Sequence, residues 1–360
     1  MKRFNSKFLA FFSVLGFLSV FAISLTSCDG VIFDEIRKEV ELADAKISGD
    51  IQNIVRYTYK GEEHVFVSTG EIYHRSVEDS VVDSKFDFSD FSTPSGYVYG
   101  LAADKENLYA ISITIEKDDD GYNMPTKRTL YCYEDGWKEI WSAEYSSSKH
   151  AIIFCTNAPQ PDHRRAFFRH GSDVWELSGA IKLTSEMVMT EIGTTNNTTI
   201  PTASSRRCTY LNGDVYFSNY AITSNETADS DATIIYRSDG GDNVYYSKNG
   251  TDWTNVDLSC STIVSLAVTS DYLLAGTDSG IVHTKLTSGI PSSGNESFST
   301  NADSTLSSYY EIPAILVINP ALSETSGTIY ASSITSSSSA SLNNVGLWSY
   351  YASENEWNRE

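Results

Sequence analysis

The chain has 360 residues, with 26 lysines and arginines against 47 aspartates and glutamates, and its formal net charge is −21. Because a protein that binds phosphate backbones needs a basic surface, this charge argues against nucleic acid as a partner. It also argues against a peripheral protein held on anionic lipid by charge. Aromatic residues make up 12% of the chain, which excludes a disordered acidic tail and allows a large core.

The first 27 residues have the features of a targeting segment. Lys2, Arg3 and Lys7 give a positive start, and residues 8–23 form an apolar run that is too short for a comfortable membrane span. This order of a basic start, an apolar run and small residues is typical of a signal peptide. Loss of this segment removes three cations and no acid, so 23 cations then face 47 acids.

A cysteine follows this segment in the motif Leu25-Thr26-Ser27-Cys28, which resembles the lipobox of bacterial lipoproteins. The resemblance implies cleavage before Cys28 and lipid attachment to its thiol, with residues 28–46 as a tether and residues 47–360 as the folded domain. Several acyl chains anchor a protein firmly, since each buried CH₂ contributes about 0.8 kcal/mol. The alternative is an ordinary signal peptide with a chance cysteine. Asp29 is a hint of inner-membrane retention, but the membrane and its face stay open.

Four further cysteines lie in strand-like segments, and the exported compartment implied by the leader permits disulfides. Their even spread and the length of the chain favour buried free thiols over two bridges. No Cys/His spacing typical of zinc is present. The four residues are Cys132, Cys155, Cys208 and Cys260.

After residue 50 the sequence predicts strands almost throughout, because apolar alternation over four to eight residues recurs between Gly, Asn, Asp and Ser clusters. The clearest unit has strands at Ile263–Val268, Tyr272–Thr277 and Ile281–Leu286, joined by three-residue turns. This is the pattern of a β-propeller blade. Six such units begin about 50 residues apart, a period typical of propellers and arrays. The units begin at Ile51, Val98, His150, Arg207, Ile263 and Ile315.

The predicted fold is therefore all-β, a propeller of six four-stranded blades over residues 47–360. The fourth unit is assigned the strands Arg207–Leu211, Asp214–Asn219 and Asn243–Ser247. A seventh blade requires strands from residues 29–46. The alternatives are a pair of β-sandwiches or a β-solenoid.

Two polar segments stand out before the clearest unit. Asp118 and Asp120 belong to the densest acidic run and are candidate Ca²⁺ ligands, because Ca²⁺ takes several oxygen ligands. The run does not fit an EF-hand, since Glu116 and Lys127 occupy its first and last positions, and a solvated hairpin loop is the preferred interpretation.

The second segment contains arginines in an otherwise acidic chain. They form a candidate patch for an anionic ligand or an acidic partner segment, with intramolecular ion pairs as the alternative. Strand alternation places Arg165 and Arg169 on one face. The patch comprises Arg165, Arg169, Arg206 and Arg207.

A turn motif carries a second family resemblance. The segment Tyr246-Ser247-Lys248-Asn249-Gly250-Thr251-Asp252-Trp253 resembles the Asp-box of sialidase-like propellers, although it is one residue short and has Asn249 in place of Asp. In that family the polar side chains cap a hairpin while the aromatic residue is buried, which gives Ser247, Asn249, Gly250 and Trp253 structural roles. Asn-Gly is also the strongest two-residue hairpin signal. The motif supports a fold and not an activity.

No catalytic constellation can be identified. The sialidase arginine motif Arg-Ile-Pro is replaced by Glu311-Ile312-Pro313, and a glutamate would repel a substrate carboxylate. No nucleophile elbow, phosphate loop or dinucleotide motif is present, so no cofactor is expected.

The leading hypothesis is a lipid-anchored, non-catalytic binding or scaffold protein of the cell envelope that holds a protein partner through a loop face. The alternatives are a propeller that binds or hydrolyses glycans and an assembly factor for envelope proteins.

Overall fold

The computed structural model describes residues 46–77, 88–179, 204–298, 306, 310–318, 328–336, 344–351 and 356–360. Residues Lys46–Glu360 form one compact unit. The predicted signal segment, Cys28 and the predicted tether as far as residue 45 lie outside the described residues. Among the described residues the regular structure is antiparallel β-sheet with one 3-10 turn at Pro161–His163, so the all-β prediction is confirmed.

The described strands form seven antiparallel sheets in chain order. The first sheet contains β1 (Val55–Tyr59), β2 (Glu62–Ser68), β3 (Ile72–Ser76) and β4 (Ser89–Phe91), and the second contains β5 (Tyr97–Ala103), β6 (Leu108–Lys117), β7 (Asn123–Tyr133) and β8 (Trp137–Glu144). The third contains β9 (Ala151–Cys155), β10 (Ala166–His170) and β11 (Asp173–Leu177), the fourth contains β12 (Arg207–Leu211) and β13 (Asp214–Ser218), and the fifth contains β14 (Ile222–Ser224), β15 (Ile235–Ser238), β16 (Asn243–Ser247) and β17 (Thr254–Asp257). The sixth contains β18 (Ile263–Val268), β19 (Tyr272–Thr277), β20 (Gly280–Thr287), β21 (Ile290–Pro291) and β22 (Glu296–Ser297), and the seventh contains β23 (Tyr310–Glu311), β24 (Ile315–Val317), β25 (Thr328–Thr335), β26 (Gly346–Tyr351) and β27 (Glu356–Arg359).

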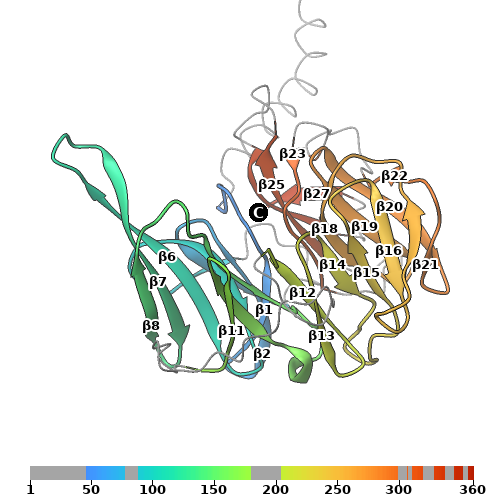
Figure 1. The fold of residues 1–360 in the computed structure, drawn as a ribbon, viewed down its shortest axis with the longest axis horizontal. Helices are drawn as coiled ribbons and strands as arrows, with labels where there is room; N and C mark the ends of the chain where they lie inside the picture. The colour runs from blue at the N-terminus through green and yellow to red at the C-terminus, as the bar shows by residue number, and fades with distance from the viewer. Residues whose placement is uncertain are drawn as a thin grey trace, which may run out of the picture. The chain divides into compact units, whose positions relative to one another are not determined.

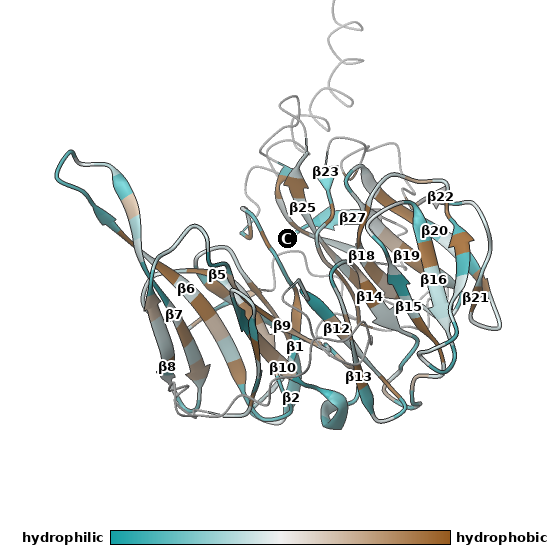
Figure 2. Ribbon diagram, viewed as in Figure 1, coloured by the Kyte–Doolittle hydropathy of each residue, from teal (hydrophilic) through white to brown (hydrophobic). Residues whose placement is uncertain are grey.

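Each sheet packs on the next one along the chain. Separate hydrophobic clusters join the first sheet to the second, the second to the third, and so on to the sixth. The sixth and seventh sheets meet where Trp357 Nε1 donates to the carbonyl of Phe298 at 3.2 Å. Strands β1, β12, β14 and β18 lie near the middle of the molecule, and β8 and β21 at its outside (Figure 1). Apolar residues run along strands within the sheets, as in β6, β7 and β19 (Figure 2).

The first and seventh sheets close the ring. One hydrophobic cluster contains Val65 and Val67 of β2 together with Leu316 of β24 and Tyr330 of β25. In addition, the backbone N–H of Ile47 donates to the carbonyl of Glu360 at 3.1 Å. The chain is therefore a β-propeller, in which the apolar faces of neighbouring sheets pack on one another around a central channel.

The number of sheets differs from the prediction of six. Arg207–Leu211 and Asp214–Ser218 form a two-stranded sheet of their own, whereas Asn243–Ser247 belongs to the next sheet. That sheet begins with Ile222–Ser224, which is too short to show an alternating pattern. The seventh sheet therefore comes from within the predicted fourth unit, and residues 29–46 are not needed for it.

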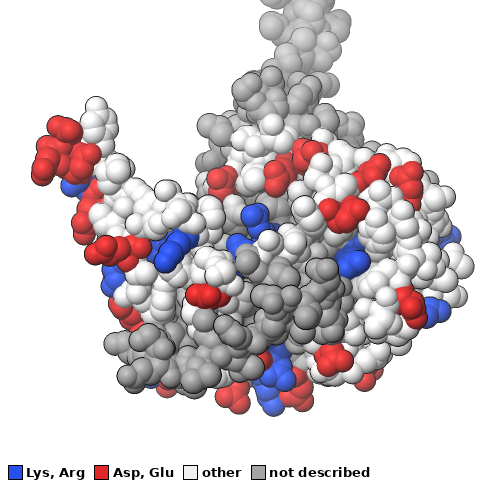
Figure 3. Space-filling model, in the orientation of Figure 1, with Lys and Arg blue, Asp and Glu red and all other residues white. Residues whose placement is uncertain are grey.

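One hairpin extends beyond its sheet. Strand β5 pairs with β6 as far as Ile113, and β8 pairs with β7 as far as Lys127. Apart from a hydrogen bond from the N–H of Tyr145 to the carbonyl of Thr126 at 2.9 Å, the strand pairing of residues 114–126 is between β6 and β7. We call residues 114–126 the β6–β7 arm. It projects from the molecule, with acidic side chains gathered at its tip (Figure 3).

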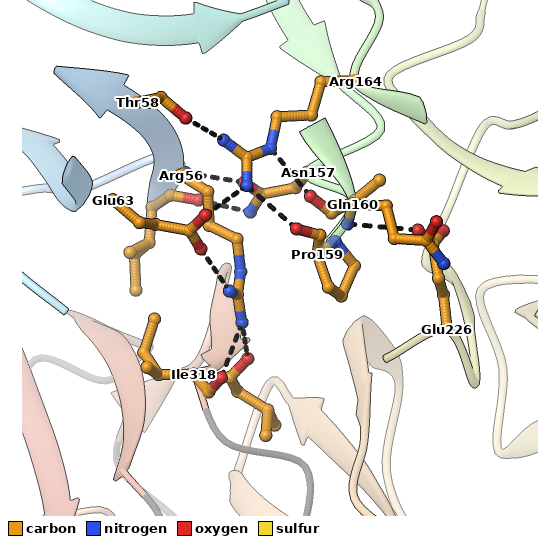
Figure 4. A network of polar contacts seen from close by, with 12 residues as sticks. Arg56, Thr58, Glu63, Asn157, Pro159, Gln160, Arg164, Glu226 and Ile318 are labelled. Atoms are coloured by element: carbon orange, nitrogen blue, oxygen red, sulfur yellow. Dashed lines mark hydrogen bonds and ion pairs between the residues drawn. The ribbon is translucent and has the colours of Figure 1, made fainter. Parts of the chain in front are cut away.

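A buried ion-pair cluster ties the sheets together across the channel. The carboxylate of Glu63 on β2 binds Arg56 Nη1 of β1 at 2.6 Å and Arg164 Nη2, from the loop before β10, at 2.5 Å (Figure 4). We call Glu63, Arg56 and Arg164 the polar clamp. Arg56 and Arg164 are only 4% and 2% exposed. Arg56 Nη2 also donates to the carbonyls of Val317 and, at 3.1 Å, Ile318, so the clamp links the first, third and seventh sheets.

The charges of the clamp are mutually dependent. Burial disfavours the charged form of Glu63, but the two guanidinium groups outweigh it and hold the pKa of Glu63 below its ordinary value. Burial lowers the pKa of Arg56, and the negative charge of Glu63 opposes this decrease. Removing the carboxylate would therefore leave two desolvated cations without their counter-charge.

We predict that Glu63→Gln lowers the free energy of unfolding by about 3 kcal/mol, because loss of the carboxylate leaves the buried guanidinium charges uncompensated. Urea denaturation at pH 7 measures this. Since the folded-state pKa of Glu63 is depressed, its contribution is complete at neutral pH and is lost as the pH falls below about 4.3. The free energies of unfolding of wild type and variant should therefore converge in acid.

Lys105→Gln, which removes an exposed ion pair with Asp162, is the control and should leave stability unchanged. Equal stability of Glu63→Gln and wild type at pH 7 would contradict the clamp.

Candidate functional site

A cavity of about 600 Å³ lies at one end of the channel and is lined by side chains from several sheets. A smaller chamber of about 140 Å³ shares four lining residues with this cavity, so the two adjoin. The shared residues are Gln52, Asn53, Arg207 and Pro313. The chamber is also lined by Arg56 of the polar clamp.

Three arginines of the predicted patch line the larger cavity, which we call the arginine cavity. Arg169 on β10 is 5% exposed, Arg206 is exposed, and Arg207 is half-buried at the start of β12. Arg207 Nη2 donates to the carbonyl of Pro313 at 3.0 Å, which fixes its guanidinium against the loop before β24. The structure therefore brings Arg169, Arg206 and Arg207 together, although residues 180–203 separate β11 from β12 in the chain.

The arginines repel one another electrostatically. Burial lowers the pKa of Arg169, and the positive charge of Arg206 lowers it further. The same two causes, in the same order, lower the pKa of Arg207. A bound anion would offset both effects, because an opposite charge nearby favours the charged form of a guanidinium.

Acids and tyrosines complete the arginine cavity. Asp50 and Glu311 also line it, so three cations face two carboxylates in a chain whose net charge is −21. Burial, followed by the charge of Asp278, raises the pKa of Glu311. Tyr97 is 44% exposed and Tyr220 is 50% exposed, which leaves two aromatic rings at the rim. These tyrosines could not be predicted as site residues, since each lies at or beyond a strand end where no pattern marks it.

Arg165, the fourth residue of the predicted patch, lies outside the arginine cavity. Its Nη1 binds Glu176 Oε1 at 2.9 Å, with both side chains about half exposed. Arg165 and Arg169 are four residues apart, which is about 13 Å along a strand. Side chains on one face of a strand can therefore lie at different ends of the channel.

The acidic run at the tip of the arm forms a hairpin turn. The Asp118 carboxylate accepts hydrogen bonds from the backbone N–H of Asp120 at 3.0 Å and of Tyr122 at 2.8 Å. Within the described part of the chain, no three His, Cys, Asp or Glu side chains are arranged to hold a metal ion. Asp118 thus has a structural role in the turn.

The four described cysteines are free. Cys132 and Cys208 are buried, and Cys155 and Cys260 are half-buried. Burial raises the pKa of all four thiols, to about 12 for Cys132 and about 11 for Cys260, which makes them poor nucleophiles.

No helix within the described ranges is long and apolar enough to cross a membrane.

The Asp-box-like segment forms the turn between β16 and β17. Ser247 Oγ accepts from the backbone N–H of Gly250 at 2.9 Å, and Asn249 Oδ1 accepts from that of Asp252 at 2.9 Å. Trp253 is half-buried against the cluster between the fourth and fifth sheets, with the Arg237 guanidinium 4.2 Å above its ring. These contacts lie in a turn and leave the motif's polar groups occupied by the backbone.

No family model and no curated protein matches this chain. Among solved structures, it is similar to the crystal structure of BBS1N in complex with ARL6DN, with a TM-score of 0.38 and 9% sequence identity. The match covers 81% of this chain and 77% of that chain.

We predict that Gly250→Ala destabilises the fold by about 2 kcal/mol more than Gly121→Ala, because overpacking a core costs about 1–3 kcal/mol. Both glycines have positive φ, of +74° and +85°, so both substitutions incur a similar backbone strain. An added Cβ at Gly250 would overlap the buried ring of Tyr216, whereas nothing lies within 4 Å at Gly121. Urea denaturation of the two variants measures the difference, and equal losses would contradict the overlap.

Proposed function

We propose that this chain is a non-catalytic binding protein of the cell envelope that holds an anionic group of its partner in the arginine cavity. The observation that carries the proposal is the convergence of Arg169, Arg206 and Arg207 on one cavity of about 600 Å³. Cavities of roughly 300–1,000 Å³ are typical of ligand sites.

Charge and shape support an anionic partner group. Guanidinium groups bind carboxylates and phosphates through paired N–H donors, and these charge-assisted bonds are stronger than neutral ones. The arginines of the cavity lie next to Tyr97, Tyr99 and the aliphatic side chains of Ile152 and Ile153. A group that fits both parts is an anion attached to an apolar or aromatic body, such as an acidic peptide segment of a partner protein.

We predict that Arg206→Gln weakens binding of a rhodamine-labelled peptide of alternating glutamate and phenylalanine at least tenfold, measured by fluorescence anisotropy. Arg206 is exposed, so the substitution should leave the fold intact. Arg165→Gln is the matched control, since Arg165 lies outside the cavity and should not affect binding. Equal affinities for the two variants, or equal binding of a glutamine–phenylalanine peptide by wild type, would refute the anionic site.

A glycan is the second candidate ligand. The exposed rings of Tyr97 and Tyr220 offer stacking surfaces, and Asp50 and Glu311 place two carboxylates in the same cavity. Glycosidases generally use a pair of carboxyl groups. A glycan array and chromogenic glycosides test this candidate, and silence on both excludes it. The role of an envelope assembly factor is a special case of the binding proposal, in which the partner is an envelope protein.

Anchoring through lipid at Cys28 would place the propeller at a membrane of the cell envelope. The basic start, the apolar run and the Leu25–Cys28 motif support this part of the proposal. The acidic charge of the chain gives no attraction to anionic lipid, so the acyl chains would supply the attachment.

We predict that Cys28→Ser moves the protein from the membrane fraction to the soluble fraction of fractionated cells, because the acyl chains would be lost. Immunoblotting of the two fractions measures this. Cys260→Ser, which changes a half-buried thiol of the folded domain, is the control and should remain with the membrane. Retention of Cys28→Ser in the membrane fraction would refute lipid anchoring at this residue.

A further inference from the structure

The β6–β7 arm is a two-stranded extension that pairs with the rest of its sheet only at its base. Beyond the last pairs with β5 and β8, the arm is a two-stranded ribbon with the pairs Ile115↔Pro125, Glu116↔Met124 and Lys117↔Asn123. Its tip is closed by the Asp118 hydrogen bonds and by donation from Asp118 N–H to the Tyr122 carbonyl at 2.9 Å. A two-stranded hairpin is marginally stable by itself in water, so packing within the sheet does not explain this extension, and we consider a functional role for it.

Large apolar side chains are exposed on the arm to an unusual extent. Ile115 is 50% exposed, Tyr122 70% and Met124 50%. These three are half of the six large hydrophobic residues that are exposed within the described ranges, although the arm has only 13 residues. Two of the other three, Tyr97 and Tyr220, belong to the arginine cavity. Ile115 pairs with Pro125 and Met124 pairs with Glu116, so Ile115 and Met124 lie on opposite faces of the ribbon. Exposed apolar groups on a projecting element are typical of a protein contact.

The charges of the arm specify the chemistry of its partner. Glu116, Asp119 and Asp120 are exposed beside the apolar side chains, with Lys117 as the one exposed cation of the arm. These acids would repel an anionic membrane surface, which argues against insertion of Tyr122 and Met124 into lipid. They match a protein surface on which an apolar patch is bordered by lysine or arginine.

The backbone edges add direction to this contact. Pro125 removes one N–H from the β7 edge of the arm, and proline on an edge discourages strand addition there. The β6 edge at residues 114–117 continues past the end of β5 and carries no proline. An extended partner segment can therefore add to the β6 edge by main-chain hydrogen bonds while its apolar side chains meet those of the arm.

We propose that the β6–β7 arm is a second interaction surface, which binds an extended protein segment whose apolar residues are flanked by lysine or arginine. The surface is separate from the arginine cavity and selects the opposite charge. A partner that is acidic at one region and basic at another could engage both surfaces, but each surface can be tested alone.

Selection from a random 12-residue peptide display library on the full-length chain tests the proposal. The apolar-arm variant combines Ile115→Ser, Tyr122→Ser and Met124→Ser. Selected peptides that bind wild type but not this variant are classed as arm-dependent. Ile290→Ser, which alters an exposed apolar residue of β21, is the matched control. We expect arm-dependent peptides that combine apolar residues with Lys or Arg, bind the variant at least tenfold more weakly, and bind Ile290→Ser and Arg206→Gln as they bind wild type.

A charge variant and a membrane control complete the test. Glu116→Gln with Asp119→Asn and Asp120→Asn should weaken the selected peptides and flatten the dependence of their affinity on salt. The absence of arm-dependent peptides, or arm-dependent peptides that are acidic or lack apolar residues, would overturn the proposal. Binding of wild type to phosphatidylcholine–phosphatidylglycerol vesicles that is lost in the apolar-arm variant would also overturn it, by showing a lipid contact. Unchanged thermal denaturation of the variants confirms that their fold is intact.

Discussion

The polar clamp is the constraint on which the geometry of the channel depends. The hydrophobic clusters between neighbouring sheets are non-directional, so they tolerate small rotations of one sheet against the next. The carboxylate of Glu63 instead binds guanidinium groups of Arg56 and Arg164 at fixed distances and in directions set by their planes. A buried ionic cluster is favourable only when its charges are matched. The clamp therefore favours one relative arrangement of the first, third and seventh sheets.

This arrangement also positions the arginine cavity. Asp50, Gln52 and Asn53 line the cavity and lead directly into β1. On β1, Arg56 belongs to the clamp and Thr58 accepts a hydrogen bond from Arg164. About 17 Å separates Asn53 from Thr58 along an extended chain. A short segment and β1 thus connect the arginine cavity to the clamp. A cavity supported in this way can hold its arginines close together despite their repulsion.

The sequence predicted the fold in its strongly patterned parts. Ile263–Val268 and Tyr272–Thr277 match β18 and β19 because alternation, turn residues and strand length agree there. The boundary between the fourth and fifth sheets was wrong, since Ile222–Ser224 is too short for a periodic signal. Within the site, the arginines could be predicted from their contrast with an acidic chain, but not which of them meet. The full set of clamp contacts could not be predicted, because Arg164 is about 100 residues from Glu63 and the Ile318 carbonyl about 260 residues from Arg56.

The closure of the ring sets the order in which the protein can fold. Ser48 pairs with Gly346, and the N–H of Ile47 bonds to the carbonyl of Glu360. Such a contact joins residues about 300 positions apart, and contacts of long sequence separation form slowly because a large loop must first be closed. Individual sheets can assemble as hairpins while the chain emerges, but the ring waits for its last strand. Until then the first sheet keeps an open apolar face, so the chain is most exposed to aggregation in the interval before that final strand arrives.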